Sequence, residues 1–198
     1  MNEAAFFRFA GYSAYFNAIV FVLSLVALMI FFSIGGIWGK INDGLSVIWM
    51  ISYIPVGAAL YLSTRSVSPS ISLISFIIGI GAMLVFTILQ ILLTIGGTSF
   101  VQTFTWVLTS TALVGLFVLV QALLARTGSL LPEGLIWIMV LYGLATVVGA
   151  VGFQIGGESH PLAMVGLTLT AIAGLVWVIW FGRLLLTERV VLALAGSA

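Results

Sequence analysis

The residues best suited to chemistry in this chain stand together in the stretch GGESHPLA, where Glu158, Ser159 and His160 follow one another. A glutamate and a histidine so placed could share a metal ion or relay a proton. A closed zinc site needs more ligands than this, and the chain has a single histidine and no cysteine. We therefore predict no metal site, which leaves His160 as the one candidate ligand of a cofactor.

Other catalytic patterns are absent from the sequence. It contains no phosphate-binding glycine loop, no Ser-His-Asp set, no HExxH motif and no pair of catalytic carboxylates. The one lysine, Lys40, lies outside the apolar runs, so a retinal Schiff base is excluded. The sequence predicts a protein that is not an enzyme and that holds no cofactor.

Neutral polar side chains inside the apolar runs are the remaining candidates for binding. Those that we single out as a polar lining for a neutral solute or a quinone are Gln90, Thr109, Ser110 and Gln121. The alternative is that they join helices to one another, where such hydrogen bonds contribute about 0.6 kcal/mol each. The sequence leaves both interpretations open.

The composition predicts that lipid, rather than water, surrounds these residues. Of 198 residues, 63% are hydrophobic and 6% are charged, and the mean hydropathy is +1.35. Soluble domains carry about 25% charged residues, so this chain has too few to cover a surface in water. Its net charge of +1 supplies no basic stripe, which excludes nucleic acid as a partner.

Six apolar runs are long enough to cross a bilayer, whose core needs about 20 residues of helix. The runs are continuous, whereas the strands of a barrel would be short and alternating. The predicted fold is an all-α membrane protein, a single transmembrane domain over 1–198. The predicted spans are 14–38, 45–63, 71–95, 102–125, 133–155 and 162–184.

The basic residues predict the direction of these spans. Lys40 follows the first span, on one side of the membrane. The arginines all fall on the other side, at positions Arg8, Arg65, Arg126, Arg183 and Arg189. Under the positive-inside rule, both termini are cytoplasmic and the chain is a multi-pass protein of the inner (plasma) membrane.

The tripeptide Ile-Gly-Gly closes the first, third and fifth runs, starting at positions 34, 95 and 155. The intervals of 61 and 60 residues divide the chain into three helical hairpins. One interpretation is a triplication with a pseudo-threefold axis along the membrane normal. The other is independent capping, because glycine past a helix end adopts the left-handed backbone. The hairpins are expected in either case.

Helix caps are predicted at three further places. Asp43 is expected to cap the second helix, after a long first loop in the stretch IWGKINDGLS. Pro132 and Glu133 are expected to open the fifth helix. His160 and Pro161 are expected to open the sixth in the same way.

Small residues recur at helical spacing and predict close approach between helices. The sequence does not decide whether the partner helix belongs to this chain or to another. The stripes consist of Ala10, Ala14 and Ala18, of Ala145 and Gly149, of Gly152 and Gly156, and of Gly166, Thr170 and Gly174.

Four stretches that together touch most of the chain resemble a group of uncharacterised bacterial six-helix membrane proteins, a domain of unknown function. They are RFAGYSAYFNAIVFVLSLVAL, WGKINDGLSVIWMISYIPVG, GGESHPLA and VWVIWFGRLLL. The resemblance implies a bacterial inner-membrane protein. It implies no activity and no functional residue.

The absence of catalytic patterns and the small-residue stripes favour a structural or accessory subunit, within a membrane complex or a homo-oligomer. The expected partners are membrane lipids, other membrane subunits or further copies of the chain. The alternative is a transporter or channel for a neutral or hydrophobic solute. A third hypothesis is that a lipid, quinone or pigment binds between the hairpins.

Overall fold

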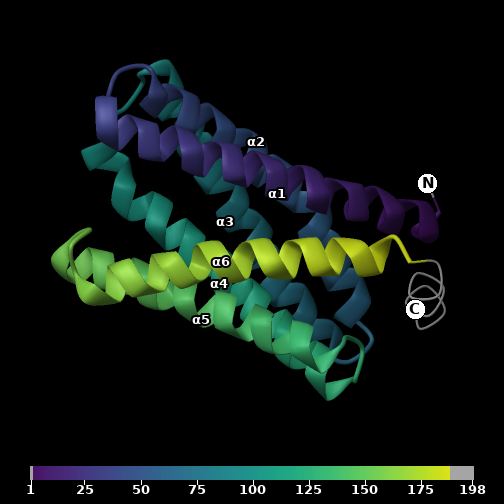
Figure 1. The fold of residues 1–198 in the computed structure, drawn as a ribbon. Coiled ribbons are helices and arrows are strands. Elements are labelled where there is room, and N and C mark those ends of the chain that lie inside the picture. Colours follow the sequence, from purple (N-terminus) through teal and green to yellow (C-terminus); the bar gives the residue numbers. More distant parts are fainter. Residues whose placement is uncertain (1, 188–198) are drawn as a thin grey trace.

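The computed structural model describes residues 2–187, and within that range every regular element is a helix. Figure 1 shows the six helices and their order along the chain. They are α1 (Glu3–Ile34), α2 (Trp38–Thr64), α3 (Pro69–Ile95), α4 (Phe100–Thr127), α5 (Glu133–Gly156) and α6 (Pro161–Leu185). The predicted all-α, six-helix fold is confirmed. The predicted helix-end residue Arg189 lies outside the described residues.

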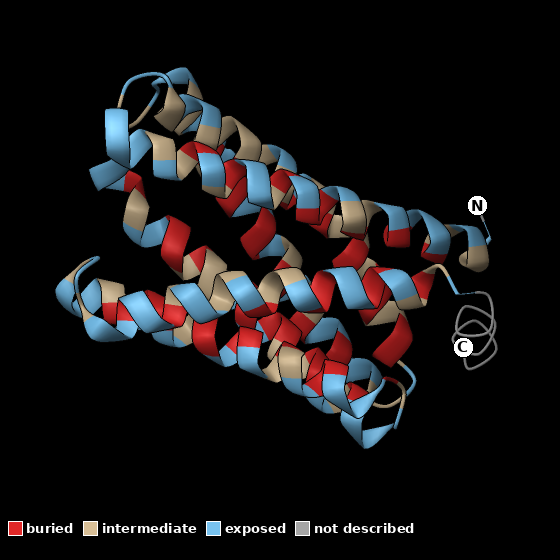
Figure 2. Ribbon diagram, viewed as in Figure 1, coloured by how far each residue is buried: buried red, intermediate tan, exposed pale blue. Residues whose placement is uncertain are grey.

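Each helix is long and apolar enough to cross a membrane, with lengths from 24 to 32 residues. Figure 2 shows buried residues toward the middle of the bundle and exposed residues on its outward faces. Those outward faces are apolar: Met29 is 71% exposed, Ile77 61% and Ile172 59%. Hydrocarbon is the solvent that suits such a surface, and the chain is a multi-pass integral membrane protein.

The helices pack as antiparallel neighbours in chain order, and α6 also contacts α1, which closes the bundle into a ring. The pairs α1–α2, α3–α4 and α5–α6 form the three predicted hairpins. In Figure 1 the ends of α1, α3 and α5 all lie at the same end of the bundle, which we call the glycine end. The start of α1 and the end of α6 lie at the opposite, terminal end.

All three Ile-Gly-Gly tripeptides end a helix on a glycine with positive φ, at Gly35 (69°), Gly96 (76°) and Gly157 (74°). The three caps differ in register, because the first glycine of the pair caps α1 and α3 whereas the second caps α5. They differ in conformation too, since only Gly96 is fully left-handed, with ψ of 18°. Capping explains the glycines, and triplication stays a prediction.

The first hairpin departs from the predicted boundaries. Helix α1 already begins at Glu3, where the Asn2 side chain accepts a hydrogen bond from the Ala5 amide at 2.8 Å. Helix α2 begins at Trp38, so the predicted long loop is absent.

Asp43 therefore lies inside α2 and does not cap it, and that prediction is wrong. The physical reason is its neighbour: Asn42 accepts a hydrogen bond from the Ser24 hydroxyl at 2.8 Å. The polar stretch joins α1 to α2 instead of forming a loop.

The starts of α5 and α6 lie close to where the sequence places them. Helix α5 begins at Glu133, although Pro132 stands at the cap position before the first turn. His160 caps α6, and its Nδ1 accepts a hydrogen bond from the Leu162 amide at 3.3 Å, with Pro161 in the first turn.

Close backbone approach joins α5 to α6 at glycines from the predicted stripes. A Cβ on Gly166 would overlap the Gly149 nitrogen and would lie 2.9 Å from the Ala145 carbonyl oxygen. A Cβ on Gly152 would lie 2.5 Å from the Ala163 nitrogen, and one on Gly156 the same distance from the His160 ring. These residues pack within the chain.

The ring closes where α1 meets α6, near the terminal end. A Cβ on Gly182 would lie 2.7 Å from the Cβ of Ala14. Ala10 and Ala18, one turn away on each side, are also buried. This stripe on α1 therefore faces the last helix of the same chain.

We predict that Gly166→Ala destabilises the protein by about 1–3 kcal/mol, because the new methyl group overlaps the backbone of α5. The matched control is Gly81→Ala, since a Cβ on Gly81 has no atom within 4 Å. Unfolding in mild detergent, followed by circular dichroism, measures both. Equal stability of the two variants would contradict the contact.

Candidate functional site

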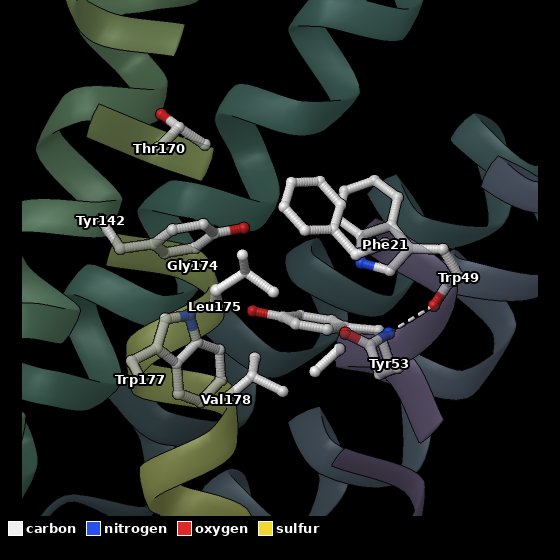
Figure 3. Close-up of a pocket in the computed structure, with 11 residues that line it drawn as sticks. Phe21, Trp49, Tyr53, Tyr142, Thr170, Gly174, Leu175, Trp177 and Val178 are labelled. Atoms are coloured by element: carbon white, nitrogen blue, oxygen red, sulfur yellow. Dashed lines mark hydrogen bonds between the residues drawn. The ribbon is translucent and has the colours of Figure 1, made fainter. Parts of the chain in front are cut away.

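A cavity lies between the α1–α2 hairpin and the α5–α6 hairpin, and Figure 3 shows its lining. The cavity is small, about 30 Å³, which leaves room for roughly two water-sized groups. The lining residues are Asn17, Ala18, Phe21, Trp49, Tyr53, Tyr142, Thr170, Gly174, Leu175, Trp177 and Val178. Both hairpins contribute, so the cavity depends on how the ring closes.

Aromatic rings form much of the wall and brace one another. The Tyr53 ring stands edge-on to the Trp177 ring, with centroids 5.7 Å apart and an interplanar angle of 89°. Tyr142 packs on Trp177 from α5, at a centroid distance of 5.9 Å. Phe21 and Trp49 form a further pair at 5.1 Å. Large rings in mutual contact have few alternative rotamers, so the wall is shaped before any ligand arrives.

Two hydrogen-bonding groups in this wall are unused. Tyr53 is 2% exposed and Trp177 is fully buried. The Trp177 Nε1 has no hydrogen-bond partner among the described residues. The Tyr53 hydroxyl lies near the Tyr142 hydroxyl but makes no hydrogen bond of normal geometry within those residues. Leaving a buried donor unpaired costs about 1–3 kcal/mol. Figure 3 shows both groups, and the Tyr142 hydroxyl, turned toward the space beside Leu175.

Two other polar lining residues, Asn17 and Thr170, already have partners. The Asn17 amide donates to the Trp49 carbonyl oxygen at 2.6 Å and to the Ser52 hydroxyl at 2.9 Å. Thr170 bonds its own helix at Gly166 and the Thr146 hydroxyl on α5, at 2.8 and 3.2 Å. No charged side chain lines the cavity. The site thus offers the Trp177 Nε1 and the neighbouring hydroxyls of Tyr53 and Tyr142 in apolar, uncharged surroundings.

Gln121, predicted as a polar lining, lies elsewhere and is fully buried on α4. Its Nε2 donates to the Ser75 hydroxyl at 2.7 Å and to the Ser72 carbonyl oxygen at 3.1 Å. Its Oε1 accepts from the hydroxyls of Ser72 and Thr64. The side chain therefore ties α2, α3 and α4 together.

The other predicted lining residues also lie outside the cavity. Gln90 is buried, and its Oε1 has no partner within residues 2–187. Thr109 bonds the Thr105 carbonyl oxygen on its own helix and accepts from Gln154 on α5 at 3.3 Å. Ser110 is buried beside it. None of these side chains lines the cavity.

His160 lies at the start of α6, where it serves as a helix cap. Within the described part of the chain, no group of three or more His, Cys, Asp or Glu side chains could hold a metal ion. His160 is not among the cavity residues.

Charged contacts gather at the terminal end of the bundle. Arg65 at the end of α2 pairs with Glu3 at the start of α1, at 3.0 Å. The Arg126 guanidinium lies 4.7 Å from the centre of the Trp137 ring. Both contacts link successive helices at one bundle end, and neither reaches the cavity.

Tyr53, Tyr142 and Trp177 were not predicted, because the polar candidates were chosen among charged groups, amides and the hydroxyls of serine and threonine. One signal was available. A buried tyrosine hydroxyl or indole nitrogen inside an apolar run needs a partner, and each of these residues lies within a predicted span.

Comparison of the chain with protein families, with curated proteins and with solved structures finds no match. The similarity to bacterial six-helix membrane proteins stays a prediction.

We predict that Gln121→Leu lowers the free energy of unfolding by about 1–3 kcal/mol, because it removes hydrogen bonds that join three helices. The control Gln154→Leu alters an exposed glutamine with one long hydrogen bond, and it should leave stability unchanged. Denaturant titration in detergent measures both. A Gln121 variant as stable as the control would show that the cluster does not support the bundle.

Proposed function

We propose that this protein binds a neutral, largely apolar molecule of the membrane in the cavity between its first and third hairpins. The observation that carries the proposal is the pair of unpaired buried donors on Tyr53 and Trp177, aimed into an apolar space. A protein core normally satisfies such groups, and those left unpaired point to a partner outside the chain.

The form of the cavity supports binding from the bilayer. It is partly open rather than sealed, and aromatic and aliphatic side chains dominate its lining. An apolar molecule dissolved in the membrane reaches such a site without crossing water. This is the third hypothesis from the sequence, and it now has the most support.

The accessory-subunit hypothesis loses part of its support. It relied on small-residue stripes being available to another chain. Gly149 and Gly166 pack on each other, and Ala14 packs on Gly182, all within one chain. The exposed outer surface is apolar, and lipid can cover it as well as another subunit can.

The transport hypothesis loses support for a similar reason. It required a polar lining that includes Gln121, yet hydrogen bonds to three residues of neighbouring helices enclose that side chain. We propose binding rather than passage.

We also propose that the protein lies in a bacterial inner membrane with both termini in the cytoplasm. The arginines support this orientation, because Arg65, Arg126 and Arg183 all lie near the terminal end of the bundle.

We predict that Gly174→Leu abolishes binding, because the new side chain enters the cavity beside Tyr142, whose ring would lie 3.1 Å from its Cβ. Ala18→Leu fills the cavity from α1 and should act in the same way. Native mass spectrometry of protein in mild detergent would show the bound molecule in the wild type. The control is Gly81→Leu, which adds the same side chain in open space. If all variants retain the same bound mass, the cavity is not the site.

The orientation is testable because the chain has no cysteine. We predict that the single-cysteine variant Ser159→Cys reacts with a membrane-impermeant thiol reagent added outside intact inner membranes. Ser66→Cys should react only after the membrane is broken. Both serines are exposed and lie in links at opposite ends of the bundle. The reverse labelling pattern would place the termini outside.

A further inference from the structure

We infer that the molecule bound in the cavity carries a carbonyl oxygen, which accepts hydrogen bonds from both the Tyr53 hydroxyl and the Trp177 indole. This inference rests on the proposed function and names the chemical class of the ligand.

The Tyr53 hydroxyl and the Trp177 indole differ in the hydrogen bonds that they can form. An indole N–H donates a hydrogen bond and cannot accept one, whereas a phenolic hydroxyl can do either. A ligand that offers only donors would therefore leave Trp177 Nε1 unpaired. The ligand must present an acceptor.

One oxygen atom is enough to satisfy both groups. A carbonyl oxygen has two lone pairs in the plane of its substituents, so that two donors can approach it from different sides. Tyr53 comes from α2 and Trp177 from α6, and their rings stand perpendicular with the donor atoms turned toward one space. Donors that converge from two helices suit a single acceptor between them.

Charge on the ligand is excluded by the surroundings. No lysine, arginine or histidine lines the cavity, so that an ionised carboxylate or phosphate would be buried without a counter-charge. An ester or a quinone presents the required oxygen and stays neutral. A free fatty acid in its ionised form does not fit.

The rest of the lining fits an apolar body. Phe21, Leu175 and Val178 offer ring and aliphatic surface, and the Tyr142 ring packs closely against Gly174. The cavity of about 30 Å³ has room for the oxygen-bearing end of a ligand, and because it is partly open, the apolar remainder can lie outside it against neighbouring hydrocarbon. The acceptor therefore lies at a substituted ring or at the head of a chain, close to the apolar part.

Three probes of matched chain length test the inference: a decyl-substituted benzoquinone, a fatty acid methyl ester and an alkylbenzene without oxygen. Each is added to the purified full-length protein in nanodiscs. Binding is measured by native mass spectrometry, and the carbonyl stretching band is measured by infrared difference spectroscopy. We expect a carbonyl probe to bind more tightly than the alkylbenzene, with its band shifted to lower frequency.

The variant Tyr53→Phe removes one hydroxyl and keeps the ring. It should weaken binding of the carbonyl probe about five- to tenfold, reduce the band shift and leave alkylbenzene binding unchanged. The matched control is Tyr61→Phe on the same helix, since Tyr61 stacks on Phe76 and does not line the cavity.

The outcomes separate the inference from the proposed function. Selective binding of the quinone identifies a quinone site, and selective binding of the ester identifies an acyl-lipid site; either supports the inference. Equal binding of all three probes, with no effect of Tyr53→Phe, overturns the inference and leaves the proposed function standing. If no probe binds, or if binding persists in Gly174→Leu, both are overturned. If Tyr53→Phe does not fold, the wild type alone tests the inference: a carbonyl band shifted to lower frequency supports it, and an unshifted band overturns it.

Discussion

Hydrocarbon offers no partner to a hydrogen-bonding group, and this constraint governs where the polar side chains of this bundle lie. Gln121 gathers hydroxyls and a carbonyl from two neighbouring helices, and Asn17 reaches from α1 to the backbone of α2. Ser24 does the same toward Asn42. Polar atoms in the spans thus join helices, and the few that remain unpaired stand out against this pattern.

Small residues decide how the helices come together around these contacts. The backbones of α5 and α6 touch at Gly149 and Gly166, which fixes the third hairpin as a unit. The α1–α6 contact at Ala14 and Gly182 then closes the ring near its terminal end. The cavity lies next to that contact on the side of the glycine end, where larger side chains such as Tyr53 and Trp177 meet. The small side chains at Ala14 and Gly182 let the helices pack closely, whereas the larger side chains beside them leave a cavity.

The sequence predicts well what depends on local composition. Long apolar runs predict the six helices, and glycine at positions 35, 96 and 157 marks three helix ends. Prediction failed at Asp43, because the polar stretch before it forms hydrogen bonds to α1 rather than a loop. The cavity could not be predicted from the sequence, for another reason. Tyr53, Tyr142 and Trp177 are far apart in the chain, and only tertiary packing brings them together. The sequence also left open whether Gln121 lines a binding site or joins helices, because that depends on the side chains around it in the folded bundle.

The contact between the first and last helices has a consequence for biogenesis. Helices enter the membrane in order as the ribosome makes them, yet α6 supplies Thr170, Gly174, Leu175, Trp177 and Val178 to the cavity. The first five helices can associate with their neighbours during synthesis, whereas the cavity lacks one of its walls until α6 has been made and inserted. Any molecule held there is therefore acquired after insertion, from the mature bilayer, and not enclosed as the chain emerges.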